Sequence, residues 1–221
     1  MNNILLCAIV VSLALPGTAI AQKAATTKET SKGKVTQPVK EIGVVETNLG
    51  TFEIELYRED APKTVDNFVK LAEKKFFDGV RVHRVVPGFV IQTGDEKSRD
   101  LKKTGEWGTG GQSIYGKPFS DELNPATLSY KAGYKKGVAA MANAGPNTNT
   151  SQFFVMLEDN PRMPKNYTIF GKVTKGIETV EKIGKVEIIA TRSPGDGRPK
   201  DDVVLKKVTI RKEPITPAAG K

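Results

Sequence analysis

Short β-rich runs separated by turn residues recur along the chain, and they constrain its fold more than any other feature. Six such runs follow an opening hairpin, at residues 80–86, 89–93, 138–142, 152–157, 168–173 and 203–210. Only two stretches, residues 62–75 and 176–183, place apolar side chains at helical spacing. Many short strands with two helices predict a mainly β fold, either a closed β-barrel or a sandwich.

The opening hairpin is expected to form from two strands around a tight turn. Residues 44–47 lead into residues 48–50, where a glycine can adopt a positive φ. Apolar and acidic residues alternate from 52 to 56, which predicts a half-buried strand. The first helix should begin near Pro62, with Asp60 as its cap.

Residues 1–21 have the pattern of an export signal. Residues 4–15 are uncharged and largely apolar, a Pro-Gly pair follows them, and residues 19–21 (Ala-Ile-Ala) offer small side chains for cleavage. We therefore predict a mature N-terminus at Gln22. The alternative is an uncleaved membrane anchor, because residues 4–21 carry no charge and a span needs about 20 residues.

An export signal predicts a protein of the bacterial periplasm or a secreted protein, with a eukaryotic secretory route as the alternative. Cys7, the only cysteine, lies inside the signal, so the mature chain would have no disulfide. After cleavage no stable membrane insertion is expected.

The flanks of the folded region differ from it in composition. Residues 22–41 are rich in Lys, Thr, Ser and Ala and predict a disordered basic linker. The folded domain is expected at residues 42–212, and residues 213–221 should form a flexible tail. The net charge of +9 could attract anionic polymers. A soluble basic surface is the simpler interpretation, and we expect a monomer without a nucleic-acid partner.

Several kinds of chemistry lack their residues in this chain. His83 is the only histidine and the mature chain would have no cysteine, which excludes a His/Cys metal site. A Ser-His-Asp site would have to use His83, and no G-x-S-x-G nucleophile motif accompanies it. Residues 108–111 are glycine-rich but lack the Lys-Ser/Thr of a phosphate loop, so a flexible surface turn is expected there. No metal or cofactor is predicted, and His83 is interpreted as a structural residue.

Arg84 is the residue that alternation singles out. On a strand it shares a face with Val82 and Val86. An arginine among valines either lines a pocket or lies at the strand edge with its charge in water. The pattern alone leaves both interpretations open.

Four segments together resemble the cyclophilin family, and they occur in that family's order. They are residues 82–95, 108–116, 141–154 and 170–173, and the similarity extends over roughly residues 44–210. The resemblance implies an eight-stranded antiparallel β-barrel capped by two α-helices, with a substrate groove on its outer face. It also implies peptidyl-prolyl cis–trans isomerase activity.

The resemblance assigns roles to individual residues of this sequence. Arg84 matches the catalytic arginine. The groove residues are a proline pocket of Phe89, Val90, Phe154 and Met163, the backbone-holding residues Gln92, Asn143 and Gln152, the wall residues Ala142 and Ala144, and Tyr167, where many members carry a histidine or tyrosine.

Two local features depart from a simple match. Phe89 and Gln92 have opposite parity on a regular strand, so a bulge or a late strand start is expected after Pro87-Gly88. Arg162 stands where cyclosporin-sensitive members carry a tryptophan, within a segment that lacks the usual Leu-Asp-Gly pattern.

The expected function is acceleration of rotation about X-Pro bonds in exported proteins, which assists their folding. The partners would be unfolded or partly folded polypeptides that contain proline. One alternative is a module that binds such clients, as a chaperone does, with little turnover. Another is a structural protein that uses its basic surface to bind anionic polymers.

Overall fold

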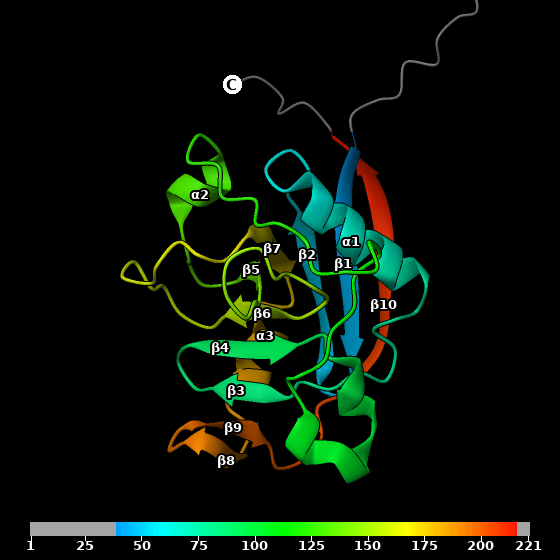
Figure 1. Ribbon diagram of the computed structural model, residues 1–221, viewed down its shortest axis with the longest axis vertical. Helices are drawn as coiled ribbons and strands as arrows, with labels where there is room; N and C mark the ends of the chain where they lie inside the picture. The colour runs from blue at the N-terminus through cyan, green and yellow to red at the C-terminus, as the bar shows by residue number, and fades with distance from the viewer. Residues whose placement is uncertain (1–38, 216–221) are drawn as a thin grey trace, which may run out of the picture. The chain divides into compact units, whose positions relative to one another are not determined.

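The computed structural model describes residues 39–215 (Figure 1). The expected export signal, most of the expected linker and the last residues of the expected tail lie outside the described residues. Strand β1 begins at Val39 and strand β10 ends at Pro214. The folded region therefore extends beyond the predicted limits of 42 and 212 at both ends.

One antiparallel sheet of ten strands organises the molecule, in the order β10-β1-β2-β7-β5-β6-β4-β3-β9-β8. The strands are β1 (Val39–Thr47), β2 (Gly50–Leu56), β3 (Arg84–Val86), β4 (Val90–Thr93), β5 (Val138–Met141), β6 (Phe153–Met156), β7 (Ile169–Lys175), β8 (Ile188–Ser193), β9 (Asp196–Pro199) and β10 (Leu205–Pro214). The predicted hairpin is the β1–β2 pair, in which Thr47 lies opposite Gly50. Eight of these strands match predicted runs, whereas β8 and β9 were not predicted.

The expectation of a closed eight-stranded barrel is wrong in strand number and in closure. Among the described residues, β10 and β8 end the sheet and do not pair with each other. The segment before β3 meets the start of β10 and the residues before it through one isolated bridge, between Arg81 and Val204, and a few backbone hydrogen bonds. The ten strands therefore surround one core without forming a continuous strand ladder around it.

Five helical segments accompany the sheet in the described part of the chain. They are α1 (Pro62–Glu73), α2 (Leu128–Ala132), α3 (Ile177–Gly184) and the 3₁₀ helices η1 (Glu96–Arg99) and η2 (Leu101–Glu106). Helices α1 and α3 match the two predicted helices. Helix α2 gave no periodic signal because it is short and buries only one residue, Ser129. No helix within residues 39–215 has the length and apolar character needed to cross a membrane.

The start of α1 differs from the prediction in its cap. Ala61 occupies the N-cap position, and the Asp60 carboxylate instead accepts a hydrogen bond from the Ser129 backbone N–H at 2.9 Å. The backbone N–H groups of Lys63 and Thr64 donate to the carboxylate of Glu122, at 3.0 and 2.9 Å. A carboxylate distant in sequence thus stabilises the exposed donors of the first turn.

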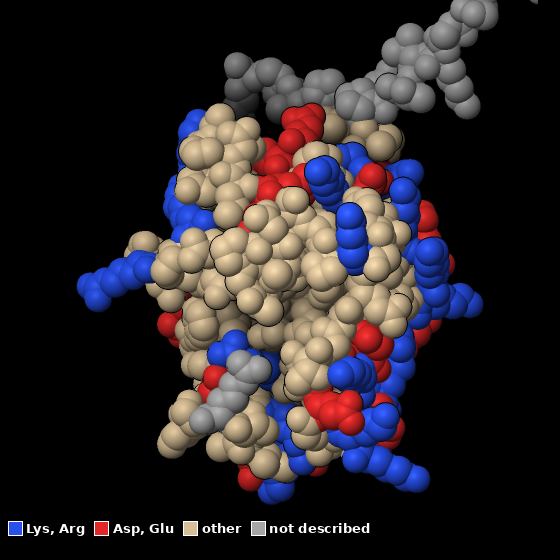
Figure 2. All heavy atoms as spheres, viewed as in Figure 1, with Lys and Arg blue, Asp and Glu red and all other residues tan. Residues whose placement is uncertain are grey.

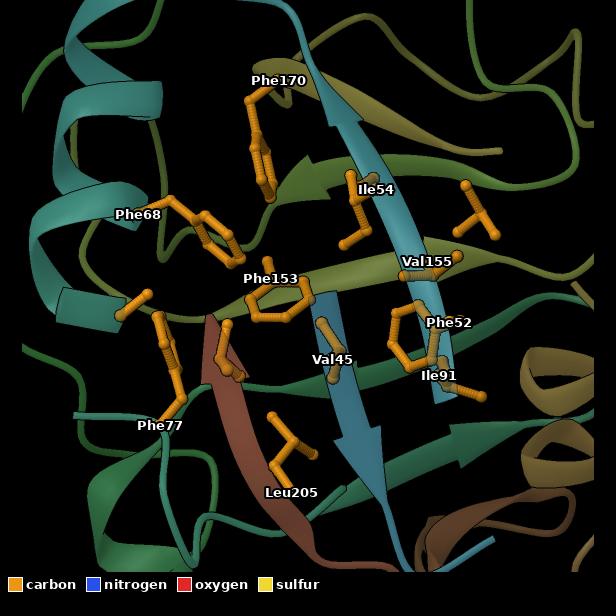
Figure 3. Packing of buried hydrophobic residues seen from close by; sticks show 14 of the residues in the cluster. Val45, Phe52, Ile54, Phe68, Phe77, Ile91, Phe153, Val155, Phe170 and Leu205 are labelled. Atoms are coloured by element: carbon orange, nitrogen blue, oxygen red, sulfur yellow. The ribbon is translucent and has the colours of Figure 1, made fainter. Parts of the chain in front are cut away.

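The hydrophobic core lies between α1 and the sheet. Figure 3 shows Phe68 of α1 directed toward Phe153 of β6 and Phe170 of β7. The ring centroids are 5.6 Å apart for Phe68 and Phe153 and 5.4 Å apart for Phe68 and Phe170. Tilted and edge-on rings at these separations add to the stabilisation from apolar burial. This core fixes the strands whose opposite faces carry the candidate site.

Candidate functional site

The β3–β4 hairpin positions Arg84. It lies opposite Gln92 in the strand register, and its side chain is 22% exposed. Gly88 has a φ of 73°, and the Phe89 backbone N–H donates to the Val86 carbonyl at 2.9 Å. This turn delays the start of β4 until Val90. The irregularity predicted from the parity of Phe89 and Gln92 is confirmed.

A chain of side-chain hydrogen bonds runs from Arg84 across two neighbouring strands. Arg84 Nη1 donates to Gln92 Oε1 at 3.2 Å, and Gln92 Nε2 donates to Gln152 Oε1 at 3.0 Å. Gln152 Nε2 in turn donates to the carbonyls of Gly108 and Gly110, at 3.1 and 2.7 Å. Three residues singled out by sequence thus form one connected network.

The glycine-rich segment that ends this network is fixed rather than a free surface turn, contrary to expectation. Asp95 has no exposed surface, and its carboxylate accepts backbone N–H bonds from Gly108 and Gly110. A Cβ atom at Gly110 would lie 2.2 Å from Asp95 Oδ1, so only glycine fits. Asp95 therefore holds the carbonyl groups that receive Gln152.

A second apolar cluster lies on the side of β6 opposite the core. Val90 and Phe154 form its buried floor, at 2% and 4% exposure. Phe89, Met163 and Tyr167 pack against this floor and are partly buried. The structure therefore brings together the four residues assigned to the proline pocket, with Tyr167 beside them.

Tyr134 is a member of this cluster that sequence reasoning missed. Its hydroxyl donates to the Tyr167 carbonyl at 2.9 Å and accepts from the Tyr167 backbone N–H at 2.9 Å. Burial raises the pKa of Tyr134 to about 12, so the hydroxyl stays protonated and keeps both bonds well above neutral pH. Tyr167 also meets Phe154 edge-on, with ring centroids 5.5 Å apart. Tyr134 and Phe154 together fix Tyr167.

The remaining predicted residues lie on the segment that joins β5 and β6. Ala142 is half-buried and donates its backbone N–H to the Gln152 carbonyl at 2.9 Å, whereas Ala144 is exposed. Asn143 Nδ2 donates to the Asn166 carbonyl at 3.0 Å. Asn143 thereby links this segment to the loop that precedes Tyr167.

Asp196 is the second residue that sequence reasoning missed. Arg84 Nε donates to Asp196 Oδ1, and Arg84 Nη2 donates to Asp196 Oδ2, both at 2.8 Å. Asp196 begins β9, which lies beside β3 in Figure 1. The Pro-Gly-Asp-Gly sequence at residues 194–197 is a turn signal that could have revealed this hairpin.

Figure 2 shows a largely uncharged middle of the viewed face, with Lys and Arg gathered around its margin. Within residues 39–215, no group of three or more His, Cys, Asp or Glu side chains could hold a metal ion. Fold and site together define an antiparallel β protein with an arginine–glutamine network and a separate apolar cluster.

Comparison with known proteins identifies the family. A family model described as cyclophilin type peptidyl-prolyl cis-trans isomerase/CLD matches residues 43–210. A peptidyl-prolyl cis-trans isomerase-like 1 of Aspergillus fumigatus is 40% identical over 170 residues, which cover 77% of this chain and 95% of that protein. This chain belongs to the cyclophilin-type peptidyl-prolyl cis–trans isomerase family, as the four segments predicted.

Further relatives differ in size from this chain. A peptidyl-prolyl cis-trans isomerase-like 2 of Cryptococcus neoformans is 41% identical over 84% of this chain, which spans only 30% of that relative. The crystal structure of a Cryptosporidium parvum cyclophilin type isomerase superposes with a TM-score of 0.67 at 31% identity, and covers 79% of this chain and 99% of its own. A second structure of that protein was determined in the presence of the dipeptide Ala-Pro.

Proposed function

We propose that this protein accelerates cis–trans rotation about X-Pro bonds, with Arg84 as its catalytic residue. The observation that carries the proposal is the placement of the Arg84 guanidinium in a fixed network on a cyclophilin fold. Phe89, Val90, Phe154 and Met163 hold the proline ring. The peptide backbone runs along Gln92, Gln152 and Asn143, with Ala142, Ala144 and Tyr167 as the wall.

The reaction needs no nucleophile because no covalent bond breaks. Amide resonance opposes rotation with a barrier of about 20 kcal/mol. In the twisted transition state this resonance is lost, and the prolyl nitrogen gains an available lone pair. The permanently charged guanidinium of Arg84 donates a hydrogen bond to that nitrogen. The bond forms only in the twisted state, so it lowers the barrier rather than stabilising the bound substrate.

Arg84 alone does not account for a large acceleration. A rate increase of about 10⁵ requires roughly 7 kcal/mol. One hydrogen bond to a charged group contributes about 1.5–3 kcal/mol. Positioning of the peptide and exclusion of water from the Arg84 interaction supply the remainder. The apolar floor formed by Val90 and Phe154 serves both purposes, because it binds the proline ring and excludes water from it.

Exchange NMR on a short Ala-Pro peptide tests this proposal. Without protein the two isomers interconvert over about tens to hundreds of seconds. With catalytic amounts of protein we expect exchange cross-peaks whose rate rises in proportion to protein concentration. A folded protein that binds the peptide without accelerating exchange would contradict the proposal, and would favour the client-binding module instead.

We further propose that the protein acts on exported polypeptides and assists their folding. The support is the sequence of residues 1–21, with its apolar run and Ala-Ile-Ala site. We expect the intact mass of protein purified from a bacterial periplasm or culture medium to match a chain that begins at Gln22. A mature mass that includes Met1 would contradict cleavage and favour the membrane anchor.

A further inference from the structure

The β8–β9 hairpin brings an acidic residue to the strand that carries Arg84. Strand β9 pairs with β3 through Gly197 and Val85, one residue beyond Asp196 and Arg84 respectively. A Cβ atom at Gly197 would lie 2.1 Å from the Ile189 carbonyl oxygen, so the hairpin closes only around glycine. This backbone pairing places the Asp196 carboxylate beside the guanidinium.

The contact restricts Arg84 more than a single ion pair would. Asp196 takes the Nε and Nη2 donors in a bidentate arrangement, and Gln92 takes an Nη1 donor. These three bonds leave two of the five guanidinium N–H donors for a peptide. A free arginine side chain samples many rotamers, and an Arg84 held on two sides has already lost that freedom before the substrate arrives.

We infer that Asp196 is a positioning residue for the isomerase reaction and acts through Arg84. This inference rests on the proposed function. The Asp196 side chain is 15% exposed, so water competes weakly for its oxygens. The carboxylate fixes the plane of the guanidinium and thereby directs the two remaining donors.

Asp196 has two opposing effects on catalysis. Its negative charge weakens the positive field of Arg84 at the prolyl nitrogen, whereas its two hydrogen bonds fix the guanidinium. The positioning effect dominates, because a misplacement of about 1 Å can reduce a rate on the order of 100-fold. Removal of the carboxylate should therefore slow the reaction, although it strengthens the positive field of Arg84 at the prolyl nitrogen.

The test measures kcat and KM for Asp196→Ala and Asp196→Asn by exchange NMR. We expect kcat to fall roughly 10- to 100-fold in Asp196→Ala with little change in KM, since the apolar cluster stays intact. Asp196→Asn keeps the shape but offers an N–H to one guanidinium donor, so its kcat should lie between wild type and Asp196→Ala. The matched control is Asp202→Ala, which removes a 2.9 Å pair with Arg81 outside the network and should leave kcat unchanged.

A spectroscopic readout separates positioning from folding and from the activity itself. The Nε–H resonance of Arg84, identified by its loss in Arg84→Lys, should be protected from water exchange in wild type and in Asp202→Ala. In both Asp196 variants that protection should fall.

Unchanged kcat in a folded Asp196→Ala would overturn the inference, as would unchanged Arg84 protection. If Asp196→Ala does not fold, the same two measurements on Asp196→Asn decide. A wild type without isomerase activity would refute the proposed function, while the Arg84 resonance would still show whether Asp196 fixes the guanidinium.

Discussion

Arg84→Ala is expected to reduce kcat about 100- to 1,000-fold, the loss typical of removing one preorganised donor from a transition state. The substitution deletes the charged group that bonds the prolyl nitrogen. It leaves the apolar floor of Val90 and Phe154 in place, so peptide binding should persist. Exchange NMR measures the rate, and titration of the same peptide measures its binding.

The Arg84→Ala variant should still fold. Arg84 makes three side-chain bonds, with Asp196 and Gln92, at the edge of the core. Leaving a partly buried partner unsatisfied lowers the free energy of unfolding by about 1–3 kcal/mol. Proteins of this size have about 5–15 kcal/mol available. A cooperative thermal transition is therefore expected.

Arg84→Lys is the matched control for charge. Lysine keeps the positive charge but lacks the planar guanidinium that Asp196 holds in a bidentate contact. If geometry matters as proposed, Arg84→Lys should stay well below wild type. Turnover close to wild type in either Arg84 variant would contradict the assigned role.

Local sequence patterns predicted the central strands and the two longer helices. The alternation at residues 52–56 and the runs around β3 to β7 succeed because one face of each strand packs on the core. Strands β8 and β9 escaped prediction because they lack this pattern. Ile189 is exposed at 41%, and β9 is made of turn-forming residues, so neither strand carries a clear two-residue period.

The candidate site likewise combines residues that the sequence predicted with residues that it did not. Arg84, Gln92 and Gln152 lie within motifs that identify them by resemblance. Asp196 lies 112 residues from Arg84 in the chain, and no local pattern links two residues so far apart. Tyr134 stands between a glycine and a lysine outside any apolar run, and only its hydrogen bonds to Tyr167 reveal its role.

The sequence could not predict that the ends of the sheet stay unpaired, for another reason. The number of strands in a sheet and the pairing of its end strands depend on backbone hydrogen bonds between distant segments. Here the segment before β10 touches the segment before β3 through hydrogen bonds such as Val82 N–H to Val203 carbonyl at 2.9 Å. These contacts form one bridge and no ladder, which hydrophobic periodicity does not reveal.

Adjacent phenylalanines on β6 offer the sharpest separation of folding from function. Phe153 faces the core, where it meets Phe68, whereas Phe154 faces the second apolar cluster beside Tyr167. The two substitutions Phe153→Ala and Phe154→Ala remove the same atoms one residue apart. Any difference between them therefore reports the face on which each ring lies.

Phe153→Ala should lower the free energy of unfolding by about 3–5 kcal/mol, because it opens a cavity among closely packed rings. Phe154→Ala should lower it less, by roughly 1–3 kcal/mol, since its cluster is smaller and borders the proposed groove. The expected order in activity is the reverse. Loss of about 1.5–3 kcal/mol of apolar contact with a proline ring reduces kcat/KM roughly 10- to 100-fold in Phe154→Ala.

Urea denaturation and exchange NMR on the two variants measure these quantities side by side. Phe153→Ala should retain near wild-type kcat/KM per folded molecule at a temperature where it remains folded. Equal losses of kcat/KM in both variants would place Phe154 outside the substrate groove, and the proline pocket would then have to be sought elsewhere on the sheet. A loss confined to Phe154→Ala ties the second apolar cluster to substrate binding, because its neighbour differs only in the side of the strand that it occupies.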